Sequence, residues 1–119
     1  MKLQNIAAAL NIAYAVVRVD GFADEEADVL AKEIKSFNMS DEQRQNLVQA
    51  YKEMSILQAV AIISNAEQAD KLEAEALTVV ALLADNELSE KEIGAYTLMG
   101  SILGFQGLKY EDARRVLGF

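Results

Sequence analysis

The sequence predicts an all-α protein, a compact bundle of about seven helices. The chain contains no proline, the residue that most often marks loops and sheet edges. Apolar residues make up 52% of the chain and aromatic residues only 7%, which indicates a core of small aliphatic side chains between crossing helices. At 119 residues, the chain is expected to form one domain over residues 1–119.

Apolar residues recur at helical spacing along most of the chain and give the expected helices in order. These cover residues 3–19, 24–37, 41–53, 55–66, 71–84, 90–103 and 110–117. Side chains with an oxygen are expected to cap four of them: Asp24, Ser40, Asp70 and Ser89. Three of these caps have Gln or Glu three residues later, as capping boxes require: Gln43, Glu73 and Glu92.

The apolar stripes are expected to form the core. The stripe of the first helix contains Leu3, Ile6, Leu10, Ala13 and Val17. In the 55–66 helix the expected core residues are Ile56, Val60 and Ile63, and in the 90–103 helix they are Ile93, Tyr96, Gly100 and Leu103. Each stripe is more simply explained as core than as a binding face.

The composition excludes several kinds of chemistry. The chain has no Cys and no His, so it contains no thiol nucleophile, no Cys/His zinc site, no Ser-His triad and no disulfide. It also lacks a glycine-rich phosphate loop, and we therefore expect a protein that is not an enzyme.

The net charge limits which classes of partner are expected. Asp and Glu number 19 against 11 Lys and Arg, a net charge of −8, so nucleic acids and anionic membrane surfaces are not expected partners. No apolar run reaches the length of a membrane span. Asn11 interrupts the stretch Ile6 to Val17, which would otherwise imitate a secretory signal, and we expect a cytoplasmic protein.

An internal repeat relates residues 13–24 to residues 78–89 at an offset of 65 residues. In each copy an apolar helix ends in Asp, a residue that tolerates left-handed backbone follows, and an oxygen cap opens the next helix. The left-handed position is Gly21 in the first copy and Asn86 in the second. The repeat therefore predicts two helix, acidic turn, helix units.

The two acidic turns are candidate cation ligands. Asp20, Asp24, Asp85 and Glu87 offer the carboxylate oxygens that Ca²⁺ and Mg²⁺ prefer. Neither turn has the Gly and Glu spacing of an EF-hand, so one site would need ligands from both turns. The alternative is that these acids are helix caps and turn formers, and that the chain is a purely structural protein-protein interaction module without a metal site.

The copy with Asp85, Glu87, Ser89 and Glu92, followed by a helix that ends in Leu103-Gly104-Phe105, resembles the TerB-like family. The first copy departs from the family signature, with Phe22 and Ala27 where the family has Glu. The resemblance implies a bundle of about seven helices, an acidic cluster that binds metal and includes Glu92, and a link to tellurite resistance. We therefore expect an accessory domain that binds a divalent cation, with a protein partner as the other expectation.

Overall fold

Six helices make up the regular structure of the part that this computed structural model describes, residues 2–19, 39–84 and 88–118. They are α1 (Leu3–Val17), α3 (Asp41–Glu53), α4 (Ile56–Ser64), α5 (Gln68–Leu82), α6 (Glu90–Leu103) and α7 (Tyr110–Leu117). The all-α prediction is confirmed, and each of these helices overlaps one of the seven expected ranges. The remaining expected helix, over residues 24–37, lies outside the described residues.

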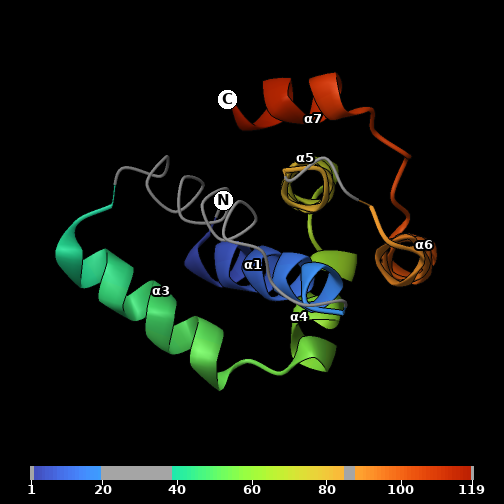
Figure 1. The fold of residues 1–119 in the computed structure, drawn as a ribbon. Coiled ribbons are helices and arrows are strands. Elements are labelled where there is room, and N and C mark those ends of the chain that lie inside the picture. The colour runs from blue at the N-terminus through green and yellow to red at the C-terminus, as the bar shows by residue number, and fades with distance from the viewer. Residues whose placement is uncertain (1, 20–38, 85–87, 119) are drawn as a thin grey trace.

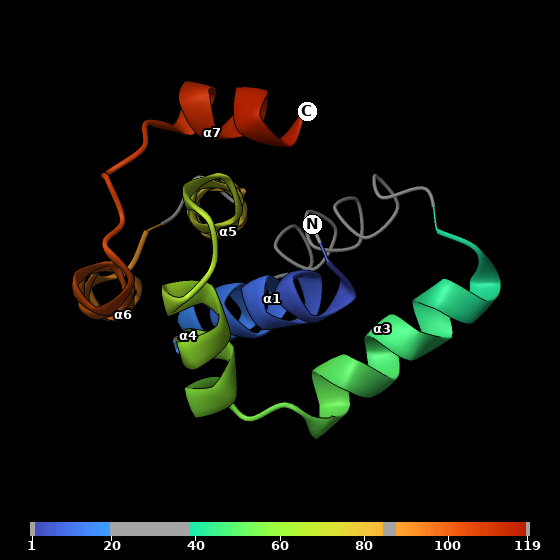
Figure 2. The ribbon, with the colours of Figure 1, turned by 180° about the vertical axis from the view of Figure 1, so that it is seen from behind.

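α1 lies at the centre of the bundle (Figure 1). It packs against α3, α4 and α5, while α7 covers the far side of α5. α6 lies beside α4 and α5 and also reaches α1, an arrangement that the reverse view in Figure 2 repeats. Residues 104–109 connect α6 to α7 and carry the chain from one side of α5 to the other.

Small side chains allow α1 and its neighbours to approach closely. Four alanines of α1 are buried, and α5 and α4 contribute further buried alanines: Ala7, Ala8, Ala9, Ala13, Ala59, Ala74, Ala76 and Ala81. Larger aliphatic side chains fill the spaces between them: Leu10, Ile12, Leu47, Ile63 and Leu77. This is the core of small aliphatic residues that the composition predicts.

Three serines start helices through reciprocal capping boxes. Ser40 and Ser89 do so as predicted, with Gln43 and Glu92 as their partners. Ser55 forms a third box with Gln58 and starts α4. Each box satisfies two backbone N–H groups that the helix itself leaves without an acceptor.

The predicted cap at Asp70 is wrong. The N-cap of α5 is Glu67, and Asp70 lies inside the first turn. The carboxylate of Asp70 instead accepts a hydrogen bond from Nδ2 of Asn5 in α1, at 2.7 Å. These residues are 65 positions apart in the chain, so the bond ties the start of α5 to the start of α1.

Two apolar residues predicted as core are exposed. Ile56 is 39% exposed and Ile93 is 46% exposed. α4 contains no charged residue and α6 contains none after Glu92, so the spacing of apolar residues alone does not identify the buried side of either helix. Neither α4, α6 nor any other helix in the described ranges is long and apolar enough to cross a membrane.

Candidate functional site

The predicted metal ligands include only one residue that the structure describes. Asp20, Asp24, Asp85 and Glu87 lie outside the described residues. Glu92 is buried, and its Oε1 accepts a hydrogen bond from the backbone N–H of Ser89 at 3.1 Å. Across residues 2–19, 39–84 and 88–118, no group of three or more His, Cys, Asp or Glu side chains is placed to hold a metal ion.

A buried carboxylate holds the connection between α6 and α7. Glu75 of α5 is only 1% exposed, and three donors surround its carboxylate. Oε1 accepts from the backbone N–H of Gln106 at 2.8 Å, and Oε2 accepts from the backbone N–H of Leu108 at 2.8 Å. The hydroxyl of Tyr96 in α6 donates to Oε2 at 3.1 Å. One carboxylate therefore joins α5, α6 and the segment that leads to α7.

The pKa of Tyr96, which donates to Glu75, is raised. Burial, the nearby charge of Glu75 and the hydrogen bond to its carboxylate together raise the pKa of Tyr96 well above the usual value for tyrosine. The ring of Tyr96 also lies against the ring of Phe105, with 5.7 Å between the centroids. Because both oxygens of Glu75 are engaged by protein donors, this carboxylate is best explained as a structural anchor.

An apolar groove of about 270 Å³ lies next to this anchor. Val79, Leu82 and Leu83 of α5 form part of its lining, together with Tyr96 and Leu108, which both bond Glu75. Among the described residues of the lining, Tyr96 brings the one titratable side chain, and its hydroxyl already donates to Glu75. The described part of the lining therefore provides no general acid or base.

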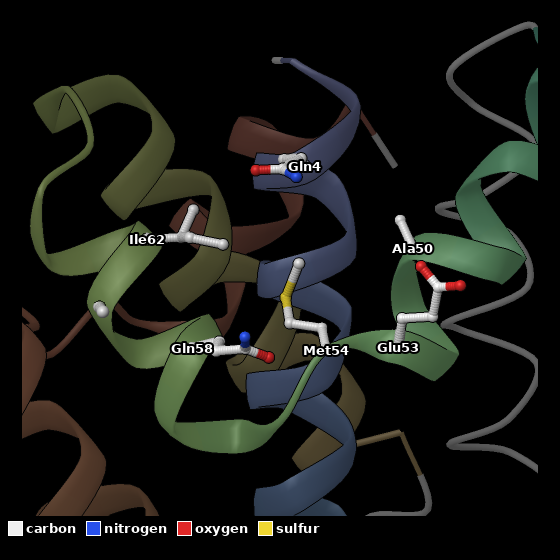
Figure 3. Close-up of a pocket in the computed structure, with 7 residues that line it drawn as sticks. Gln4, Ala50, Glu53, Met54, Gln58 and Ile62 are labelled. Atoms are coloured by element: carbon white, nitrogen blue, oxygen red, sulfur yellow. The ribbon is translucent and has the colours of Figure 1, made fainter.

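A larger groove of about 540 Å³ runs along α1 between the end of α3 and α4 (Figure 3). Met54 lies within it, with Gln4, Gln58 and Ile62 nearby. Glu53 is the one acidic residue among the described residues that line it, and its Oε1 accepts a hydrogen bond from Nε2 of Gln49 at 2.6 Å. A lone carboxylate beside amides and apolar groups does not form the acid and base pair that a hydrolytic site needs.

Exposed apolar side chains lie on both α4 and α6, and we call them together the α4–α6 surface. It consists of Ile56 and Leu57 of α4 and Gly94, Leu98 and Ile102 of α6. Leu57 is 79% exposed, Leu98 65% and Ile102 53%. Behind the surface, Val60 of α4 and Met99 and Leu103 of α6 belong to one hydrophobic cluster, so the two helices pack together.

Charged residues are missing from both segments that carry this surface. Residues 55–66 and residues 93–108 contain no Asp, Glu, Lys or Arg, in a chain that is 25% charged. This absence is visible in the sequence and is the signal that could have identified the surface. The helical spacing of apolar residues assigns Ile56 and Ile93 to the core, and for this reason it does not indicate an exposed apolar surface on these two helices.

The sequence matches no protein-family model and no curated protein. Among solved structures, it is similar to the crystal structure of a protein of unknown function from Porphyromonas gingivalis W83. The TM-score is 0.82 at 21% sequence identity, over 100% of this chain and 91% of the other. This similarity shows a shared fold, and the resemblance to the TerB-like family stays a prediction.

Proposed function

We propose that this chain is a protein-protein interaction domain without an enzymatic activity, and that its α4–α6 surface is where a partner binds. The observation that carries the proposal is the exposure of Leu57, Leu98 and Ile102 on two helices that pack together. Single exposed apolar residues are ordinary, but exposed apolar residues gathered on neighbouring helices are typical of interaction sites.

The lack of charge supports the same proposal. A small acidic protein normally covers its outward helix faces with Asp, Glu and Lys, as α3 and α7 do here. Charged groups are depleted at the centres of protein interfaces because they lose hydration when they are buried. The outward side of α4, and that of α6 from residue 93 onward, have the composition of an interface centre.

The alternatives receive less support from the described residues. An enzyme would need a cleft with a reactive group, and the groove acids Glu53 and Tyr96 are each occupied by a hydrogen bond. A cation site would depend on the two acidic turns, and the buried position of Glu92 is already explained by its capping box with Ser89. The interaction proposal rests only on residues that the structure describes.

Photo-crosslinking tests the proposal. Replacing Leu98 with the photoreactive residue p-benzoylphenylalanine, in the cells that naturally make the protein, should give discrete adducts after irradiation. An adduct of any defined mass supports an interaction through this surface.

The matched control places the same photoreactive residue at Val48 of α3, which is 47% exposed and lies on a helix that contributes no residue to the α4–α6 surface. Position 48 should give no discrete adduct. The proposal fails when position 98 gives none either, or when positions 48 and 98 give the same products.

A further inference from the structure

Methionine is the only sulfur-containing residue type in this chain, which has four Met and no Cys. The structure describes three of the four, Met39, Met54 and Met99, and each of them is half-buried. A peroxide oxidises the thioether of methionine to a sulfoxide, which changes a flexible apolar side chain into a polar one. Any response of side-chain sulfur to an oxidant must therefore come from a methionine.

Met54 differs from the other two because it lies in the groove between α3 and α4 (Figure 3). The groove holds about 540 Å³, and the side chains of Gln4, Glu53 and Gln58 in its lining are exposed, so small solutes can enter it from the solvent. Met39 and Met99 are not among the described residues that line it. Because access governs how readily a thioether is oxidised, the groove favours Met54.

The other side of Met54 faces the core. The residue is the C-cap of α3, directly before the capping box of Ser55 that starts α4. Its side chain packs against both hydrophobic clusters of the bundle, the one that contains Leu10 and Leu47 and the one that contains Ile63. Among the described helices, α3 packs chiefly against α1. Met54 is therefore part of what holds the end of α3 to the bundle.

The groove also offers hydrogen-bond donors to the oxygen that oxidation adds. Gln4 of α1 and Gln58 of α4 line the groove together with Met54. Oε1 of Gln58 accepts a hydrogen bond from the backbone N–H of Ser55 at 2.8 Å, and the NH₂ group of the same amide supplies donors. Because a polar group is costly to bury without a partner, the sulfoxide favours the groove, whereas the thioether favours the apolar clusters.

We infer that Met54 is the methionine that a peroxide oxidises first among those described, and that its sulfoxide loosens the end of α3 from the core. With hydrogen peroxide, the O–O bond breaks, one oxygen bonds to the sulfur of Met54, and the other leaves as water with both hydrogens. The sulfur is oxidised by two electrons and the peroxide is reduced by two. The site does not depend on the proposed binding of a partner to α4 and α6.

Oxidation rates of the full chain test the site. The protein is treated with hydrogen peroxide, the reaction is quenched at intervals, and the sulfoxide fraction is measured by mass spectrometry after trypsin digestion. Cleavage after Lys and Arg places the three methionines on separate peptides, residues 36–44, 53–71 and 92–109. In the folded chain, Met54 should be oxidised about threefold or more faster than Met39 and Met99. In concentrated urea the three rates should be similar, because unfolding exposes all three thioethers.

Amide hydrogen exchange after oxidation tests the consequence. Exchange over residues 50–53, the last turn of α3, should become about tenfold or more faster, while exchange over α5 should not change. Met54→Leu keeps an apolar side chain of similar volume that peroxide does not oxidise, so this variant should fold and should lose the effect. Met99→Leu is the matched control, because Met99 also packs against both clusters, and it should keep the effect.

Three outcomes overturn the inference. Oxidation of Met39 or Met99 as fast as that of Met54 in the folded chain would show that the groove gives Met54 no preferential access. Faster exchange over α3 in peroxide-treated Met54→Leu, equal to that in treated wild type, would assign the effect to another residue. Unchanged exchange over α3 in wild type with Met54 fully oxidised would show that the sulfoxide leaves the packing of this helix intact.

Discussion

The carboxylate of Glu75 accepts a hydrogen bond from the backbone N–H of Leu108 at 2.8 Å, and this bond ties the segment before α7 to the middle of α5. Gln106 and Tyr96 donate to the same carboxylate. The anchor fixes where the 104–109 connection runs, and with it the positions of α6 and α7 on α5. It therefore helps to hold α6 in place beside α4, and both helices carry exposed apolar side chains.

Replacing Glu75 with Gln should destabilise the fold by about 3 kcal/mol. The amide NH₂ would face backbone N–H groups, so at least one buried donor would lose its acceptor, and the charge that strengthens the remaining bonds would be gone. Urea unfolding measures the change. Glu111→Gln, at an exposed position in the first turn of α7, is the matched control and should cost less than about 1 kcal/mol. Equal effects for the two variants would contradict the anchor.

Stability should fall in alkaline solution because of Tyr96. Its pKa is raised in the folded state, so above the unfolded value of 10.0 the unfolded chain loses the hydroxyl proton while the folded chain keeps it. The contribution is fully present below pH 10.0 and is lost as the pH rises towards the folded-state pKa. Unfolding free energies measured from pH 8 to pH 11.5 should decline less steeply in Tyr96→Phe than in wild type.

Tyr110→Phe is the control for this pH dependence, since Tyr110 lies at the exposed start of α7. Its profile should follow that of wild type. Parallel profiles for wild type and Tyr96→Phe would show that Tyr96 does not couple stability to pH.

Replacing Gly94 and Gly104 with alanine should change the stability of the protein in opposite directions. Gly104 ends α6 with φ +73°, a left-handed conformation that costs alanine about 1 kcal/mol, so Gly104→Ala should destabilise the protein. Gly94 is helical, and Gly94→Ala should stabilise the protein by about 1 kcal/mol. Thermal unfolding measures both. A loss of stability at Gly94 would mean that the fold itself needs this glycine.

Divalent cation binding stays a prediction, and with it the connection to tellurite stress. If both acidic turns bind one ion, Ca²⁺ or Mg²⁺ should raise the melting temperature of metal-stripped protein more than matched NaCl does, and an ion at 100 times its Kd adds about 2.7 kcal/mol. Asp20→Asn and Asp85→Asn should each abolish that rise. The same shift in NaCl as in the divalent salts would leave these acids as caps and turn formers.

Local sequence patterns predicted most of the helices correctly. The starts at Ser40 and Ser89 follow from short-range capping, because the bonding partners are three residues away. Ser55 and Gln58 satisfy the same pattern, so this box could have been predicted as well. The bounds of α3, α6 and α7 agree with the expected ranges, and those of α3 and α6 do so because a capping box fixes where each helix starts.

Long-range contacts explain what the sequence did not predict. Asp70 has the chemistry of a helix cap, but its carboxylate bonds Asn5 in α1, and no local pattern predicts that pairing. Glu75 stands in an apolar run, and its donors are backbone N–H groups 31 and 33 residues away, which side-chain patterns do not reveal. The spacing of apolar residues predicts Ile56 as a core residue, but the side chain is exposed. α4 contains no charged residue that would show which of its sides faces the solvent.

Amide hydrogen exchange tests the interaction surface most directly. The protein is labelled in an extract of the cells that make it and, separately, as dilute purified protein. We expect slower exchange in the extract over Ile56–Ser64 and Glu90–Leu103, and no change over Asp41–Glu53, because α4 and α6 carry the proposed binding surface and α3 does not. Equal exchange rates for α4 and α6 in the two samples would contradict it.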